Sequence, residues 1–204
     1  MNTIRSIAAG LTIAALALLP GCGASKTVER VDPNAAIDLS GEWNDTDSRL
    51  VADEMINDLL ARPWFPEFKA ASSGRPPVVI VGTVRNRTDE HIQTTAFIRN
   101  LERDLINSGK VEFVANKEER QEVREERADQ QENATDETVK RFKQETGADF
   151  MLSGDITSIV DREEGAQVRY YQVNLQLLNL ETNRKVWLGE KKIKKFISRS
   201  GAKF

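Results

Sequence analysis

Few residues in this 204-residue chain have the types and spacing that catalysis requires. His91 is the only histidine and Cys22 the only cysteine, so the chain offers neither a Cys/His metal cluster nor a supported Ser-His-Asp or Cys-His arrangement. It also lacks the glycine-rich loops G-x-x-x-x-G-K-[ST] and G-x-G-x-x-G that cradle phosphates. These observations argue against an enzyme, and they predict no catalytic residue, no metal site and no cofactor.

Paired carboxylates are the one catalytic device that the residue types leave open. Acids are abundant, but nearly all of them lie in charged runs that are typical of solvated helices. Asp155 is the exception, because it interrupts an apolar stretch. We expect Asp155 to be hydrogen-bonded at the end of a strand rather than to act in catalysis.

Residues 1–21 have the pattern of an export signal. A positive charge at Arg5 precedes a short apolar run, Ile7–Leu19, which is too short for a comfortable transmembrane helix. The run ends in Leu19-Pro20-Gly21-Cys22, which resembles a bacterial lipobox. That resemblance implies that diacylglycerol and a further acyl chain such as palmitate anchor Cys22, and Gly23 in place of an aspartate favours the outer membrane. The alternative is an ordinary signal peptide with a chance cysteine.

The remaining chain is expected to form one domain on a tether. Residues 22–42 are polar and aperiodic, which predicts a lipidated flexible tether. Residues 43–198 are long enough for a single globular domain, and residues 199–204 form a C-terminal tail. The formal net charge of −3 is too small to indicate a nucleic-acid partner.

Hydrophobic periodicity predicts an α/β fold for that domain. Apolar stripes predict helices that begin near residues 47 and 94, with a third core helix over 135–147, while 116–133 suits a solvated charged helix. Aliphatic or alternating runs predict strands at 78–84, 111–115, 150–159, 171–177 and 185–192. We therefore expect a small mixed sheet of four to five strands, with helices on both faces and a C-terminal antiparallel hairpin.

A polar loop follows the strand 78–84, and a buried strand that leads into a charged loop often presents a functional edge. Since His91 has no plausible catalytic partner, we expect this loop to shape a binding surface. Arginine and tyrosine are frequent hot spots of interfaces. The candidate partner-binding residues are four from this loop and two from an exposed edge further along: Arg85, Asn86, Arg87, His91, Arg162 and Tyr170.

Several segments, in order along the chain, resemble the LpoB-type penicillin-binding-protein activators. They are the aliphatic strand with its Asn-Arg-Thr loop and three later motifs: Val84–Thr88, Ser108–Val114, Gly147–Gly154 and Leu180–Trp187. The resemblance extends from about Trp43 to about Lys191. It implies a domain similar to the N-terminal domain of TolB, although the tether here is shorter than the Pro-rich tether of the best-known members.

The same resemblance implies a function in cell-wall biogenesis and cell shape. We expect a monomeric outer-membrane lipoprotein that faces the periplasm, docks on a small regulatory domain of a bifunctional penicillin-binding protein and activates that peptidoglycan synthase. Two alternatives stay open. One is a structural or assembly lipoprotein of the curli-secretion-like class, which has no synthase partner and would form rings. The other is a carboxylate enzyme that acts on cell-wall glycan.

Overall fold

The structure, a computed structural model, describes residues 26–198. The chain divides into two units, residues 1–33 and 34–204, and residues 26–33 of the first carry neither helix nor strand. The predicted signal peptide, Cys22 and the tail 199–204 lie outside the described residues. Within residues 26–198 there is no helix with the length and apolar character that a membrane crossing needs.

The first helix, α1 (Asp45–Ala61), buries one apolar stripe that includes Val51, Met55 and Leu59. It begins two residues earlier than Asp47, because Asn44 is the N-cap and Asp47 completes a capping box with it. The helix ends before Pro63, which disfavours helical backbone at the preceding residue.

The aromatic connector after Pro63 forms a second helix, α2 (Trp64–Ala71). Trp64 is buried and meets Phe150 edge-on, with ring centroids 5.2 Å apart, and Phe68 meets the same ring at 5.2 Å. The aromatic side chains of α2 therefore pack against the core.

The third helix, α3 (Thr94–Asn107), matches its prediction. Phe97, Leu101 and Leu105 are buried on one face, spaced four residues apart. Gly109 follows the helix with φ +64°, a left-handed conformation that glycine adopts at helix ends without steric cost.

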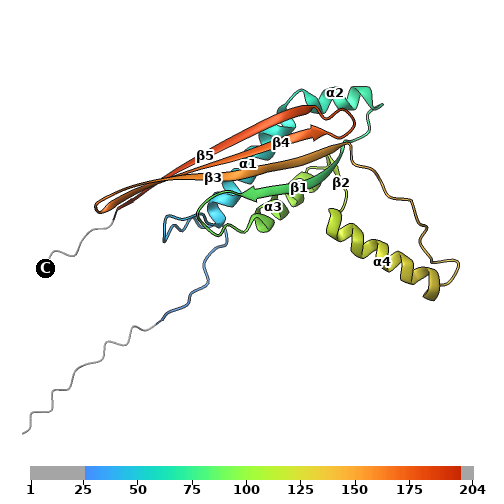
Figure 1. The fold of residues 1–204 in the computed structure, drawn as a ribbon, viewed down its shortest axis with the longest axis horizontal. Coiled ribbons are helices and arrows are strands. Elements are labelled where there is room, and N and C mark those ends of the chain that lie inside the picture. The colour runs from blue at the N-terminus through green and yellow to red at the C-terminus, as the bar shows by residue number, and fades with distance from the viewer. Residues whose placement is uncertain (1–25, 199–204) are drawn as a thin grey trace, which may run out of the picture. The chain divides into compact units, whose positions relative to one another are not determined.

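One five-stranded sheet runs in the order β2-β1-β3-β4-β5 (Figure 1). Its strands are β1 (Val78–Asn86), β2 (Glu112–Phe113), β3 (Phe150–Glu163), β4 (Ala166–Asn179) and β5 (Lys185–Ser198). β1 pairs in parallel with β2 and β3, whereas β3, β4 and β5 are antiparallel. The predicted mixed sheet with a C-terminal hairpin is confirmed, with β3 rather than β1 at its centre.

The three C-terminal strands extend beyond β1. β1 pairs with β3 only as far as Ile156, so residues 157–163, 166–172 and 192–198 form a three-stranded ribbon, as Figure 1 shows. We refer to these residues as the ribbon. The sequence predicted shorter strands here, because the alternation of apolar residues fades where the ribbon leaves the core.

The hydrophobic core lies on one face of the sheet. Apolar side chains of α1, α2 and α3 pack against alternate residues of the strands, among them Leu152, Val173 and Leu177. Among the described residues, no helix packs over the intervening side chains of β3, β4 and β5, which are polar and partly exposed. The three helices that contribute buried residues, α1, α2 and α3, thus pack on one face of the sheet, whereas the sequence placed helices on both faces.

The crossover between β2 and β3 explains the missing helix layer. The third core helix expected at 135–147 does not form, and α4 (Lys117–Asn133) is the solvated charged helix, with no buried residue. The segment after α4 has only Val139 and Phe142 to bury, and Phe142 stays about half exposed. Lys143 also takes a left-handed φ of +59°, which interrupts a helix.

Candidate docking surface

The uncovered side of the sheet is the largest surface that the fold leaves without a helix. Strand pairing aligns its side chains in rows across three strands. We call this side the open face, and it comprises Arg85 of β1 together with Ser153, Asp155, Thr157, Ile159, Tyr170, Gln172, Asn174, Gln176, Leu188, Glu190, Lys192, Lys194 and Phe196.

Polar side chains in the middle of the open face are joined in one hydrogen-bonded network. Gln172 donates to Asn174 Oδ1 at 3.0 Å and to Glu190 Oε2 at 2.8 Å, and it accepts from the Tyr170 hydroxyl at 3.3 Å. Asn174 donates to Asp155 Oδ1 at 3.1 Å. Because each group holds the next, the network presents donors and acceptors in fixed positions.

Cations lie at two sides of this network. Arg87 Nε lies 3.6 Å from Asp155 Oδ2, and Lys192 Nζ lies 2.6 Å from Glu190 Oε1. The hydrogen bond that Lys192 donates to Glu190 raises the pKa of Lys192. Asp155 is hydrogen-bonded and ion-paired within the open face, as a structural role predicts, but it lies inside β3 and not at the strand end that was expected.

Large apolar side chains interrupt the polar rows. Leu188 is 68% exposed, Ile159 66% and Phe196 71%. Apolar side chains that stand among fixed polar groups are typical of surfaces that are covered by a partner. The open face can therefore bind a surface.

The structure brings three of the six predicted binding residues to the open face. Arg85 is exposed and pairs in register with Asp155, Arg87 contacts Asp155, and Tyr170 lies two residues along β4 from Gln172. Arg85 and Arg87 were predicted from the loop and Tyr170 from the later edge, and the fold brings both regions to one surface.

The other three predicted residues lie elsewhere. Asn86 holds the loop, since its side chain donates to the Glu90 carbonyl at 2.6 Å and accepts from the Thr88 backbone at 3.0 Å. His91 is exposed, with its Nε2 3.0 Å from Gln93 Nε2. Arg162 pairs in register with Gln167, on the opposite side of the sheet from Tyr170.

Glu90 explains how the loop is positioned. Its side chain turns inward, where it pairs with the buried Arg169, accepts from the Tyr171 hydroxyl at 2.5 Å and accepts from the Trp43 backbone at 3.0 Å. Burial raises the pKa of Tyr171 to about 12. The loop is thus fixed through its acid, and its arginines face outward.

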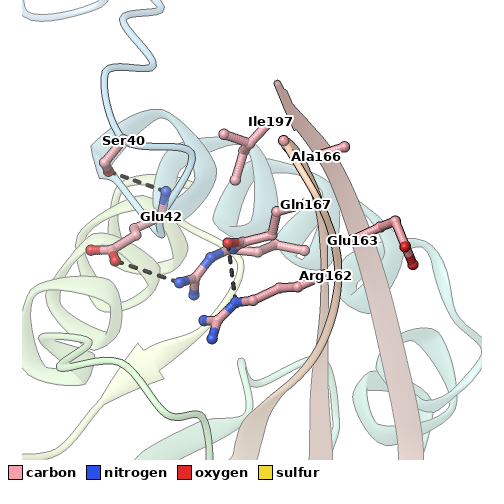
Figure 2. Close-up of a pocket in the computed structure, with 9 residues that line it drawn as sticks. Ser40, Glu42, Arg162, Glu163, Ala166, Gln167 and Ile197 are labelled. Atoms are coloured by element: carbon pink, nitrogen blue, oxygen red, sulfur yellow. Dashed lines mark hydrogen bonds and ion pairs between the residues drawn. The ribbon is translucent and has the colours of Figure 1, made fainter. Parts of the chain in front are cut away.

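A hollow of about 440 Å³ lies on the helix side of the ribbon (Figure 2). Glu42 and Arg162 extend into it, while Glu163 points away. Glu42 Oε1 lies 3.6 Å from the buried Arg169, and Arg162 Nε donates to Gln167 Oε1 at 3.2 Å. Of the two arginines that line the hollow, Arg169 is ion-paired with Glu42 and Arg162 is bonded to the neutral Gln167.

Three residues of the network, Gln172, Asn174 and Glu190, were missed by the sequence prediction, although one signal for two of them existed. Alternation along 171–177 predicted one buried and one wet face, and Gln172 and Asn174 are the wet positions. Their partners on β3 and β5 depend on strand register, which periodicity does not reveal. Residues 26–198 hold no group of three or more His, Cys, Asp or Glu side chains arranged for a metal ion.

Solved structures of low sequence identity resemble the chain. The LpoB C-terminal domain from Salmonella enterica is 16% identical with a TM-score of 0.42, and the match covers 73% of this chain and 99% of that one. The NMR structure of Escherichia coli LpoB is 14% identical with a TM-score of 0.40, covering 95% of this chain and 94% of that one. No curated protein matches the chain.

A family profile provides the decisive comparison. The profile described as "Peptidoglycan-synthase activator LpoB" matches residues 47–193, which is more than half of the chain. The match spans α1 through most of β5, so it includes every strand of the open face. It confirms the family resemblance drawn from the sequence motifs. The chain therefore belongs to the LpoB family of peptidoglycan-synthase activators.

Proposed function

We propose that this protein is an outer-membrane lipoprotein that binds and activates a bifunctional penicillin-binding protein, and so regulates cell-wall synthesis. The observation that carries the proposal is the family match over residues 47–193. Acylated Cys22 holds the protein on the periplasmic face of the membrane, and the domain acts as a monomer on the periplasmic regulatory domain of the synthase. Activation needs no chemistry from the activator itself.

The docking surface that we assign is the open face around Gln172. Its polar groups are held by one another, so little side-chain freedom is lost when a partner binds. Leu188 provides an exposed apolar anchor near the start of β5, and Arg85 and Arg87 provide guanidinium donors at the other side. Tyr170 completes this surface at the start of the ribbon.

Activation by such a surface is a coupling free energy. The protein must bind the active conformation of the synthase more tightly than the idle one, and the difference in affinity equals the shift in the synthase equilibrium. A tenfold stimulation through this equilibrium needs about 1.4 kcal/mol of differential binding. A few contacts on the open face are enough to provide that amount.

The direct test is polymerisation of lipid II by the cognate bifunctional synthase, with and without the mature protein. The proposal expects a severalfold higher polymerisation rate, together with saturable binding to the isolated regulatory domain. The activator alone should leave lipid II unchanged. Absence of both stimulation and binding contradicts the proposal, and turnover of glycan by the protein alone supports the carboxylate enzyme instead.

A further inference from the structure

The ribbon end of the open face exposes apolar side chains that lie beyond the row of Gln172. Ile159 and Lys194 both pair in register with Tyr170, and Phe196 belongs to the next row outward. Leu39 is 94% exposed, and it lines a hollow together with Phe196 around the edge of β5. We call Ile159, Lys194, Phe196 and Leu39 the tip patch.

The chain that leads back to Cys22 enters the domain at this same end. Lys195 Nζ lies 2.6 Å from Asp38 Oδ1 and 2.6 Å from Asp47 Oδ2, and it donates to the Glu42 carbonyl at 3.0 Å. Residues 38–42, at the end of the segment predicted as a tether, are therefore bound to β5.

A close approach at Gly41 supports this entry point. Gly41 has φ +73°, and a Cβ at this position would collide with the side chain of Ile197. Only glycine fits here without displacing the end of β5. The residues just before α1 are thus packed on the helix side of the ribbon, and Leu39 lies at the edge of β5, where it lines the same hollow as Phe196.

We propose that the tip patch rests on the lipid bilayer that holds Cys22. This inference depends on the lipid anchor of the proposed function. Cys22 lies sixteen positions before Asp38, so the intervening chain spans at most about 55 Å, which keeps the ribbon end at a high local concentration near the membrane. Phe196, Ile159 and Leu39 would enter the interface, while Lys194 keeps its ammonium group at the headgroups.

Apolar contact rather than charge carries this binding. Glu163 and Glu164 lie at the hairpin turn next to the tip patch and oppose attraction to anionic lipid. A bilayer is favoured over a protein partner because the anchored chain itself returns to this end of the ribbon. Leu188 lies eight residues along β5 from Phe196, so the end of the docking surface at Leu188 stands about 26 Å further along the strand from the membrane contact.

The test uses the mature lipidated protein in vesicles of phosphatidylethanolamine with a minor fraction of phosphatidylglycerol. A tryptophan reporter is placed in the tip patch by Phe196→Trp, and a matched reporter by Leu180→Trp, in the turn at the opposite end of β4. Lipids brominated on the acyl chains quench tryptophan at the interface. We expect at least twofold stronger quenching for Phe196→Trp, relative to the unsubstituted protein, and no added quenching for Leu180→Trp.

Flotation of the vesicles separates the possible failures. If the Leu180→Trp variant does not float with the vesicles, the lipid anchor is wrong and the proposed function loses its membrane attachment. If both variants float but are quenched equally, only the tip-patch proposal is overturned. If the Phe196→Trp reporter is shielded from the brominated lipids, and this shielding is lost when added lipid dilutes the protein, the patch contacts a second copy of the chain. Loss of synthase stimulation in Phe196→Ser, without quenching of the reporter, would assign it to the synthase. Either result also overturns the proposal.

Discussion

Glu90 and Arg169 form the most buried ion pair, each with a side chain 8% exposed, among residues 26–198. Arg169 has two further acids nearby, Glu42 at 3.6 Å and Asp89 at 3.9 Å, and its Nε has no hydrogen-bond partner. The pair joins the polar loop after β1 to the ribbon. The positions of Arg85 and Arg87 on the open face therefore depend on a contact that lies behind them.

Removing the charge of Glu90 is expected to destabilise the domain. Glu90→Gln leaves the buried Arg169 with only its longer contacts to Glu42 and Asp89. We expect a loss of about 3 kcal/mol in the free energy of unfolding. The double variant Glu90→Gln/Arg169→Met removes both charges and should lose less than the single variant. Urea denaturation measures both values. A double variant whose loss is the sum of the two single losses would contradict this interpretation of the pair.

Tyr171 provides a pH-dependent prediction. Its folded pKa of about 12 lies above the ordinary value of about 10, so the neutral phenol is favoured in the folded state. That contribution is fully present below about pH 10 and is lost as the pH rises toward 12, by roughly 2 to 3 kcal/mol. Phenolate absorbance should show one of the two tyrosines ionising near pH 12. Tyr171→Phe should remove that step and flatten the alkaline loss of stability, and an unchanged late step would refute the assignment.

At the scale of elements, two helices begin with the same cap but depend on different forces. Asn44 caps α1 and Asn116 caps α4, each in a capping box with an acid three residues on. α1 buries a full apolar stripe, whereas α4 has no buried residue. Packing therefore holds α1, while α4 depends on its cap and on the ion pairs that Arg124 and Arg127 make with Glu145 in the following segment.

This contrast yields a matched pair of variants. Asn44→Ala should lower the free energy of unfolding of the whole domain by about 1 kcal/mol, because α1 is part of the core. Asn116→Ala removes the same kind of cap but should leave global stability within about 0.5 kcal/mol and instead speed hydrogen exchange within α4. Native-state hydrogen exchange distinguishes the two. Equal global losses would show that α4 is coupled to the core.

The elements also show what sequence reasoning can reach. Two helices could be predicted because their buried residues follow the helical period. These residues are Val51, Met55 and Leu59 in α1, and Phe97, Leu101 and Leu105 in α3. A helix was predicted at 135–147 because Val139 and Phe142 have helical spacing. It does not form, because two apolar residues bury too little surface to stabilise a helix. The open-face network depends on the register of β3, β4 and β5. Tertiary packing sets that register, so it cannot be predicted from the sequence of any one strand.

At the scale of the whole domain, helices on one side leave the other side of the sheet available. The polar network around Gln172 occupies the middle of that side, with the tip patch at one end. A sheet face built in this way changes little on binding, because its backbone is held by strand pairing on both sides. The domain therefore suits a role as a rigid docking module whose effect arises in its partner.

The most direct test of this account compares two exposed leucines in the stimulated polymerisation of lipid II. Leu188 is 68% exposed on the open face, and Leu50 is 48% exposed on α1, away from it. Leu188→Asp places a charge on the docking surface and should reduce synthase stimulation at least tenfold, while Leu50→Asp serves as the matched control and should stimulate as the unsubstituted protein does. Circular dichroism should show both variants folded. Full stimulation by Leu188→Asp, or equal loss in both folded variants, would contradict docking through the open face.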